Sequence, residues 1–307
     1  MAVTAAMVKE LREISGAGMS ACKDALVEAN GDIKRASEIL REKGLATAAK
    51  KAGRIAAEGL VATAITNDRK KGAIVEINSE TDFVAKNEDF VSFVQNMANQ
   101  VLNSTATTVE AVLAEKWLAD SSQTAQEVLT HKIATIGENL GFRRFERYEA
   151  GAGSVIIDYI HGGGRVGVML EMSAADINDA VLEVGRNVCM QIAAMSPQFV
   201  SSADMSQEYI ENEKAILLKT ALNENEQEAK PKPPGVIEKM VEGRLKKQLK
   251  EVCLVESEYV RDDSMTVGQY LETVKATVLR FVRFEKGEGV EKKEENFAEE
   301  VAKAMQG

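Results

Sequence analysis

Apolar residues in the first 45 positions recur at helical spacing between glycine-containing breaks. Ala5, Val8 and Leu11 share one helical face, and two further apolar stripes follow before Gly44. This periodicity predicts three short helices, the last of which we expect to end at Gly44, because glycine disfavours a helix interior. A unit of about 40 residues has little core of its own. We therefore expect it to act as a docking domain.

A strand–turn–strand–helix pattern occurs twice in the middle of the chain. In both copies the second strand ends in a glutamate followed by an apolar residue, Glu76-Ile77 and Glu171-Met172. Strand pairs followed by an amphipathic helix predict small antiparallel sheets with helices on one face. The expected elements are strands 58–65 and 73–78 with helix 89–101, and strands 153–160 and 166–172 with helix 178–194.

The last third of the chain is mainly helical in pattern. Residues 204–229 and 236–252 have helical character on either side of a proline-rich break. Two helices joined in this way predict an antiparallel hairpin that projects from the body and is a candidate surface for self-association. A short amphipathic helix is expected at 294–305, whereas residues 103–123 carry no clear pattern.

These patterns predict an α+β fold of several parts. The expected parts are an N-terminal three-helix domain similar to ubiquitin-associated domains (1–45), a linker (46–57), a core N-subdomain (58–140), a core C-subdomain (141–200 and 251–286), a helical hairpin insertion (201–250) and a C-terminal helical module (287–307).

Charge and composition narrow the class of function. The chain of 307 residues has a formal net charge of −10, which opposes binding to RNA unless a basic patch offsets it. No apolar run approaches the roughly 18 residues that a membrane span requires. Three widely spaced cysteines are typical of a reducing compartment, and the first residues enter a helical pattern without a leader. We expect a cytoplasmic protein that binds other proteins, without direct contact to nucleic acid or membrane.

The usual signatures of catalysis or cofactor binding are weak. Gly162, Gly164 and Gly167 match a dinucleotide-binding spacing, but a strand pattern follows them where a helix is required, so we interpret them as a hairpin turn. His131 and His161 are the only histidines, and neither has a cysteine at metal-ligand spacing. We expect no metal, no cofactor and no catalytic residue. Cationic clusters at 50–54 and 143–147 are interpreted as solvated faces.

The segment from Thr81 to Asn87 places a large aromatic residue beside a carboxylate between a strand and a helix. Loops on a rigid scaffold commonly carry binding sites. An exposed Phe83 would contribute roughly 2–3 kcal/mol on burial in a partner. In the alternative interpretation, Phe83 packs beneath its own helix, where Phe90 and Val94 continue an apolar stripe.

This segment resembles the signature of the elongation factor Ts family, the nucleotide exchange factors for elongation factor Tu in bacterial translation. Other segments agree in order along nearly the whole chain. They include Gly16-Ala17-Gly18-Met19, Cys22-Lys23-Asp24-Ala25-Leu26, Ile136-Gly137-Glu138-Asn139, His161-Gly162, Lys239-Met240-Val241-Glu242-Gly243-Arg244, Thr266-Val267-Gly268-Gln269 and Arg283-Phe284-Glu285.

The resemblance implies an exchange factor that is not an enzyme, whose partner is elongation factor Tu in its GDP-bound and nucleotide-free forms. It implies that Asp82 and Phe83 form a wedge near the partner's magnesium and phosphate site, that Thr81 and Val84 shape the loop, and that Phe83 is therefore exposed. Further implied partner contacts are Arg12, Met19, Lys23, Ile136, Gly137, His161 and Val260.

Two positions depart from the family pattern. Ser20 follows Met19 where an apolar residue is common, and Arg261 stands where an apolar residue can occur.

Two alternative functions come from other classes, namely an RNA-binding translation protein with the three-helix unit as its arm, and a pure docking adaptor. Salt-dependent RNA binding would indicate the first, and activity without residues 55–286 would indicate the second.

Overall fold

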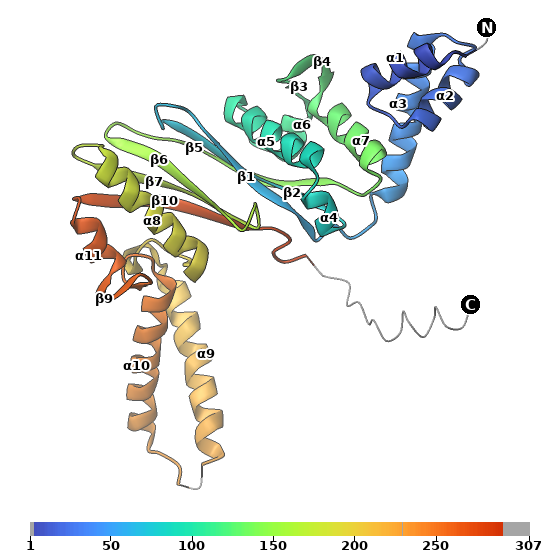
Figure 1. The fold of residues 1–307 in the computed structure, drawn as a ribbon. Helices are drawn as coiled ribbons and strands as arrows, with labels where there is room; N and C mark the ends of the chain where they lie inside the picture. Colours follow the sequence, from blue (N-terminus) through green and yellow to red (C-terminus); the bar gives the residue numbers. More distant parts are fainter. Residues whose placement is uncertain (1–2, 229, 291–307) are drawn as a thin grey trace.

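The computed structural model describes residues 3–228 and 230–290, and it has the predicted α+β class. Three helices at the N-terminal end are followed by two three-stranded sheets with helices on their outer sides, and a pair of long helices projects from the second sheet (Figure 1). The helix predicted at 294–305 lies outside the described residues. Among those residues, none of the helices combines the length and apolarity needed to cross a membrane.

The N-terminal helices are α1 (Ala5–Ser15), α2 (Met19–Glu28) and α3 (Ile33–Lys51). The expected end of the third helix at Gly44 is wrong, because α3 continues to Lys51 and passes into the predicted linker. A Cβ at Gly44 would lie 3.5 Å from the Cβ of Ala134 on α7 (Ala125–Ile136). The helix α3 therefore packs against α7 at this position, and a small side chain there would make an ordinary van der Waals contact.

The first sheet contains β1 (Glu58–Ile65), β2 (Lys71–Ser79) and β5 (Gly141–Glu149), all antiparallel in the order β1-β2-β5. The helices α5 (Glu88–Asn103), α6 (Val109–Ala114) and α7 contribute to the apolar core beside it. The predicted boundary after residue 140 assigns β5 to the second subdomain. That placement is wrong, because β5 pairs with β2 along its whole length.

The second sheet contains β6 (Ser154–His161), β7 (Val166–Ala174) and β10 (Ala276–Glu285) in the order β10-β7-β6. The helices α8 (Asp179–Met195) and α11 (Val267–Glu272) contribute to its core. The strand at 166–174 bears out the hairpin interpretation of the glycine motif, because no helix follows that turn.

The repeat extends further than the sequence pattern indicates. After the long helix, each copy has a two-stranded ribbon. In the first copy β3 (Lys116–Trp117) pairs with β4 (Asp120–Thr124), and in the second copy β8 (Glu258–Tyr259) pairs with β9 (Asp262–Thr266). Each ribbon leads into a helix whose first turn carries a capping box, formed by Thr124 and by Thr266. The third strand of each sheet follows. The unpatterned segment 103–123 therefore contains the first copy's ribbon.

The two sheets pack against each other through an apolar layer. Its buried residues come from both sheets: Val61, Ile74, Tyr148, Ile156, Met169 and Phe284. A Cβ on Gly167 would lie 2.4 Å from a methyl of Val61, and one on Gly72 would lie 2.7 Å from Ile156 and Met169. Both glycines therefore allow an approach that no other residue permits without displacement of a neighbour.

The projecting pair consists of α9 (Gln207–Glu226) and α10 (Pro234–Val252), preceded by the short 3₁₀ helix η1 (Ser202–Asp204). Ala221, Ile237 and Val241 form its buried seam. At its base, Phe199 forms a parallel bridge with Cys253. The described part of the tip contains the predicted proline-rich break.

The arginines at 143–147 do not form a solvated face. Arg143 and Arg144 both pair with the carboxylate of Glu76, which is completely buried, at 3.0 and 2.5 Å. Arg147 donates hydrogen bonds to the carbonyls of Val101 and Ala106. The sequence pattern did not predict this, because the buried acidic partner lies almost 70 residues away.

We expect Gly167→Ala to lower the free energy of unfolding by about 1–3 kcal/mol, because the added methyl overpacks the layer between the sheets. Gly243→Ala is the matched control, since this glycine lies on α10 with open space around it. That change should stabilise the protein by up to about 1 kcal/mol through helix propensity. Urea unfolding of both variants would measure the difference, and equal effects would contradict the close-packing role of Gly167.

Candidate functional site

Two helix caps define the loop that carries Phe83. Thr81 caps the single turn α4 (Asp82–Ala85), and Asn87 caps α5 by accepting hydrogen bonds from the amides of Asp89 and Phe90. Ala85 is buried beneath the turn, whereas the Phe83 side chain is 80% exposed. Of the two interpretations of Phe83, the structure supports exposure. An isolated aromatic presented this fully gains nothing from the chain's own core.

A single carboxylate holds the start of this loop. One oxygen of Glu138 accepts hydrogen bonds from the amides of Glu80 and Thr81 at 3.1 and 3.0 Å. Its other oxygen accepts the Thr81 hydroxyl at 2.6 Å. In return, the Glu80 carboxylate accepts the amide of Asn139 at 2.5 Å. Charge-assisted bonds of this kind are the stronger ones, so they fix the base from which Phe83 projects.

Glu138 was missed as a functional residue. Apart from its place in a segment that resembles the family, its signal in the sequence is its position directly after Gly137, which ends α7 in the left-handed conformation with φ +86°. That turn aims the chain back toward β2. The Glu138 side chain then reaches residues nearly 60 positions earlier, a contact that spacing within one segment does not reveal.

The loop carries an ion pair beside its aromatic ring. Lys86 lies 2.6 Å from the Asp82 carboxylate, and its Nζ is 5.9 Å from the centroid of the Phe83 ring. The hydrogen bond from Lys86 lowers the pKa of Asp82, whose side chain is about half exposed. Asp82 is therefore ionised at neutral pH, next to a ring that has no partner within the described residues apart from this cation.

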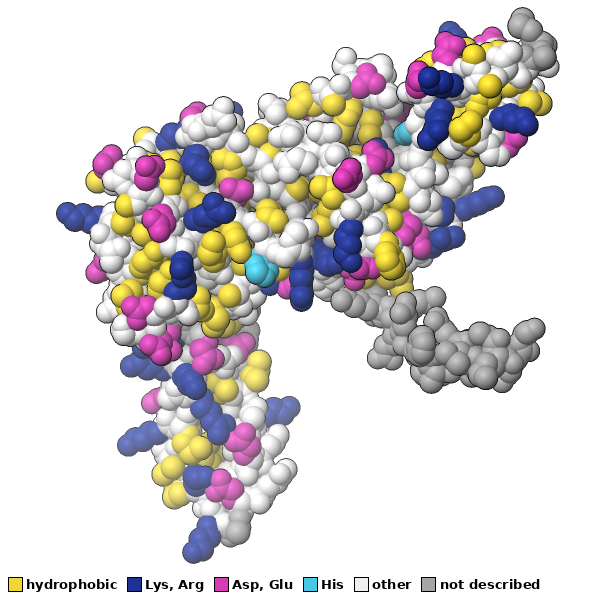
Figure 2. Space-filling view, viewed as in Figure 1, with side chains coloured by type: hydrophobic (Ala, Val, Ile, Leu, Met, Phe, Trp, Pro, Cys, Tyr) yellow, Lys and Arg dark blue, Asp and Glu magenta, His cyan; other side chains and the backbone are white. Residues whose placement is uncertain are grey.

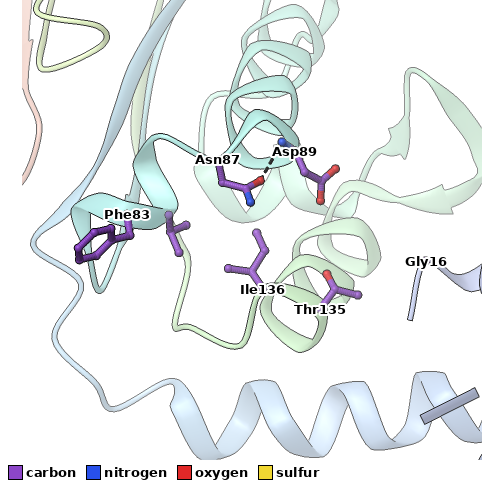
Figure 3. A pocket seen from close by; sticks show the side chains of 7 residues that line it. Gly16, Phe83, Asn87, Asp89, Thr135 and Ile136 are labelled. Carbon is purple, nitrogen blue, oxygen red and sulfur yellow. Dashed lines mark hydrogen bonds between the residues drawn. The ribbon is translucent and has the colours of Figure 1, made fainter. Parts of the chain in front are cut away.

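A shallow hollow of about 460 Å³ connects the loop to the N-terminal domain. Its lining comes from four places, namely the α4 loop, the first turn of α5, the end of α7 and the turn after α1: Gly16, Phe83, Val84, Asn87, Asp89, Thr135 and Ile136. In Figure 3, the Phe83 ring points away from the other labelled side chains, and the Ile136 side chain projects from the end of α7. Ile136 is the last residue of α7.

The predicted contacts of the N-terminal domain flank the turn that borders this hollow. Arg12 lies near the end of α1, and Met19 begins α2 with 57% of its side chain exposed. Lys23 follows one helical turn later and is exposed. Ile14 is 62% exposed in the same region and was missed, because an apolar residue on α1 is expected to face the core.

His161 and Val260 lie on the second half of the molecule, apart from the Phe83 loop. His161 ends β6, and its Nδ1 is 2.9 Å from the Tyr159 hydroxyl. Val260 is 52% exposed at the tip between β8 and β9, where its amide donates to the buried Gln191. Arg261 turns back to donate to Asn187 on α8 at 2.8 Å. The departure at Arg261 therefore has a structural partner.

The first ribbon repeats this arrangement with a residue that was not predicted. Leu118 is 58% exposed at the tip between β3 and β4, and its amide donates to the buried Gln100 at 2.7 Å. Gln100 on α5 and Gln191 on α8 have equivalent positions in the two copies. Each side chain donates a hydrogen bond to the carbonyl two residues before the exposed tip residue, Leu118 or Val260. Buried amides with all partners supplied hold both tips rigidly.

His131 lies on α7 where the N-terminal domain meets the first sheet's helices. A Cβ at Gly16 would lie 3.3 Å from its ring, and its Nε2 is buried without a hydrogen-bond partner in the described residues. Burial lowers the pKa of His131, and the positive charge of Lys132 lowers it further. A hydrogen bond with the Ser15 backbone and the negative charge of Asp89 raise it, but the net shift is downward. The imidazole is therefore neutral at physiological pH.

Charged side chains of both signs are interspersed over the face seen in Figure 2. The fold and this surface define a multipart α+β scaffold that presents an exposed aromatic on a braced loop, beside a small helical domain.

Comparison with known proteins identifies the family. The model of the family described as "Elongation factor TS" matches residues 80–288. An elongation factor Ts of Clostridium perfringens is 54% identical over 307 residues, covering 98% of each chain. Those of Clostridium botulinum and Clostridium novyi are 52% and 48% identical, each covering 99% of both chains. The chain belongs to the elongation factor Ts family, as its resemblance predicted.

Glu138→Ala should loosen the Phe83 loop, because three donors lose their acceptor. We expect hydrogen exchange of the Glu80 and Thr81 amides to become at least about tenfold faster, which corresponds to roughly 1.4 kcal/mol of lost protection. Glu110→Ala, on an exposed position of α6, is the control. Unchanged exchange in the Glu138 variant would show that the carboxylate does not hold the loop.

The lowered pKa of His131 makes stability depend on pH. A neutral buried imidazole contributes its full stabilisation above the unfolded pKa of about 6.5, and this is lost as pH falls through the folded pKa. Wild-type protein should therefore lose more stability between pH 7.5 and pH 5.5 than His131→Gln, which cannot titrate. Urea unfolding at both pH values measures this, and parallel losses would refute the assignment.

Proposed function

We propose that this chain is a guanine nucleotide exchange factor for elongation factor Tu and accelerates the release of GDP. Membership of the elongation factor Ts family supports the partner and the activity. The observation that carries the proposal is the 80% exposure of Phe83 on a loop fixed by Glu138. A rigid, exposed aromatic can be inserted into a partner with little loss of conformational entropy.

Exchange requires no covalent chemistry from this chain. A factor that binds the nucleotide-free partner more tightly than the GDP-bound partner must weaken GDP binding by the same factor. Phe83 acts as the wedge near the partner's magnesium and phosphate site, where burial of the ring contributes about 2–3 kcal/mol. Asp82, ionised beside Lys86, places a negative charge at the same point and disturbs the groups that hold magnesium.

The remaining predicted residues supply binding energy away from the wedge. Thr81 and Val84 shape the loop, Ile136 borders the hollow beside it, and Gly137 caps the end of α7. Contacts through Arg12, Met19 and Lys23 grip the nucleotide-binding domain of the partner, and His161 and Val260 reach another of its domains. Energy gained at remote contacts can then drive insertion of Phe83.

Self-association through α9 and α10 stays a prediction. Ile216, Leu222 and Val236 are 59, 44 and 45% exposed on these helices, which supports a surface that can pair with apolar groups.

Phe83→Ala should slow the release of fluorescent GDP from elongation factor Tu by about 30- to 150-fold at equal protein concentrations. This factor corresponds to the roughly 2–3 kcal/mol expected for burial of the ring. Stopped-flow fluorescence measures the rate. Val91→Ala is the matched control, because Val91 is also apolar and exposed on α5 but lies outside the loop.

The Phe83 variant should fold normally, since its ring contributes nothing to the core. Full acceleration by Phe83→Ala would refute the wedge but retain the exchange function. Wild-type protein that does not accelerate release would refute the function itself.

A further inference from the structure

Two glutamates are buried between the sheets, one from each copy of the repeat. Glu76 on β2 is completely buried, and Glu171 on β7 is 5% exposed. Each pairs with an arginine directly opposite on the third strand of its own sheet. Arg144 on β5 lies 2.5 Å from Glu76, and Arg280 on β10 lies 2.8 Å from Glu171.

Each arginine also reaches the other sheet. The Arg144 guanidinium lies 4.2 Å from the ring centroid of Phe284 on β10, and that of Arg280 lies 4.0 Å from the ring of Tyr148 on β5. Each also donates to the carbonyl that follows the aromatic residue, at 3.3 Å in both cases, from Arg144 to Glu285 and from Arg280 to Glu149. The same arrangement thus occurs twice, with the roles of the two sheets exchanged.

We call these groups the Glu76 latch (Glu76, Arg144 and Phe284) and the Glu171 latch (Glu171, Arg280 and Tyr148). A planar guanidinium suits both because it can bind a carboxylate along one edge and stack on a ring with its face. A lysine could keep the ion pair, but it has no plane to stack and no second fork of donors.

Additional donors satisfy both carboxylates. Glu171 accepts the Ser154 hydroxyl at 2.7 Å and the Gly151 amide at 3.2 Å. Burial alone would raise the pKa of Glu171, but these donors and Arg280 together lower it. Glu76 accepts the Gly287 amide at 2.8 Å as well as Arg143. Both carboxylates are therefore held in fixed positions by several hydrogen-bond donors.

The latches lie between the two regions that the exchange proposal uses. Glu76 lies on the strand that leads into the Phe83 loop, whereas His161 ends β6 and Val260 lies beyond α8, both in the second half. Binding of the partner in the second half can affect the position of Phe83 only if the two sheets keep one relative orientation.

We propose that Arg144 and Arg280 are positioning residues that hold the two sheets as one body and so couple partner binding at His161 and Val260 to the action of Phe83. This inference rests on the exchange function proposed above. The arginines themselves need not touch the partner, since they act through the orientation of the strands that carry the contact residues.

The charge-conserving variant Arg144→Lys/Arg280→Lys tests this role, because it leaves Glu76 and Glu171 paired while it removes the stacking and the bond across the sheets. At saturating concentration we expect GDP release from elongation factor Tu to slow at least about fivefold, the lower end of typical coupling between sites. Arg186→Lys, on an exposed position of α8, is the control and should release GDP at the wild-type rate.

A second substitution separates coupling from a merely structural role. In the wild-type background, Val260→Ala should lower the release rate at saturation. In the double-lysine background it should raise only the concentration for half-maximal rate, because binding at the tip no longer acts on Phe83. An unchanged rate in the double-lysine variant, or a Val260 effect on rate that persists in it, would overturn the proposal.

The rigidity of the contact between the two sheets can be measured in the absence of elongation factor Tu. Spin labels at Glu110→Cys on α6 and Glu272→Cys on α11 lie on the two halves, and all three native cysteines are buried. Double electron–electron resonance should give a broader distance distribution in the double-lysine variant than in wild type. An equally narrow distribution would overturn the latch. If wild-type protein does not accelerate release, the exchange proposal fails and the coupling with it, whereas this distance measurement still decides whether the arginines hold the sheets.

Discussion

Contact between the two sheets is the constraint on which the rest of the structure depends. At its centre, Gly72 pairs with Tyr148 across the strands of the first sheet, and Gly167 pairs with Phe284 in the second. Each glycine leaves room for apolar groups of the opposite sheet. The adjacent aromatic ring is also the platform on which an arginine from the opposite sheet stacks. Close approach, aromatic cover and buried charge therefore form one symmetric interface, and removal of any one of them affects the others.

The candidate site arises where the two copies of the repeat differ. Between β7 and α8 the chain crosses in four residues, whereas between β2 and α5 it forms the extra turn α4, which carries Phe83. The second copy instead has the long helical pair between α8 and its ribbon. The shared elements build a stable frame, and the inserted elements carry surfaces that the frame does not need. Such a division allows an aromatic side chain to be exposed without weakening the core.

Local patterns were sufficient for much of this fold. Helical and alternating periodicity placed β1, β6 and the helical pair closely. Features that depend on residues distant in the sequence could not be predicted from local patterns. Gly44 continues a helix because α7 packs there, β5 was not recognised as a strand of the first sheet, and Arg144 was interpreted as solvated because Glu76 is distant in sequence. At the site, the resemblance identified the loop, but spacing could not decide whether Phe83 was exposed or reveal that Glu138 braces it.

The base of the helical pair has a consequence for how this family can vary. Backbone hydrogen bonds join Phe199 and Val200 to residues 252–255, so the chain leaves and re-enters the second half at adjacent points. These bonds close the frame on either side of the helical pair, and Tyr209 of α9 packs edge-on against Phe199 at this base. The cost of closing a loop rises only slowly with its length. The helical pair is therefore free to lengthen, shorten or disappear during evolution, while the ribbon at Val260 keeps its register and the sheets keep their contact.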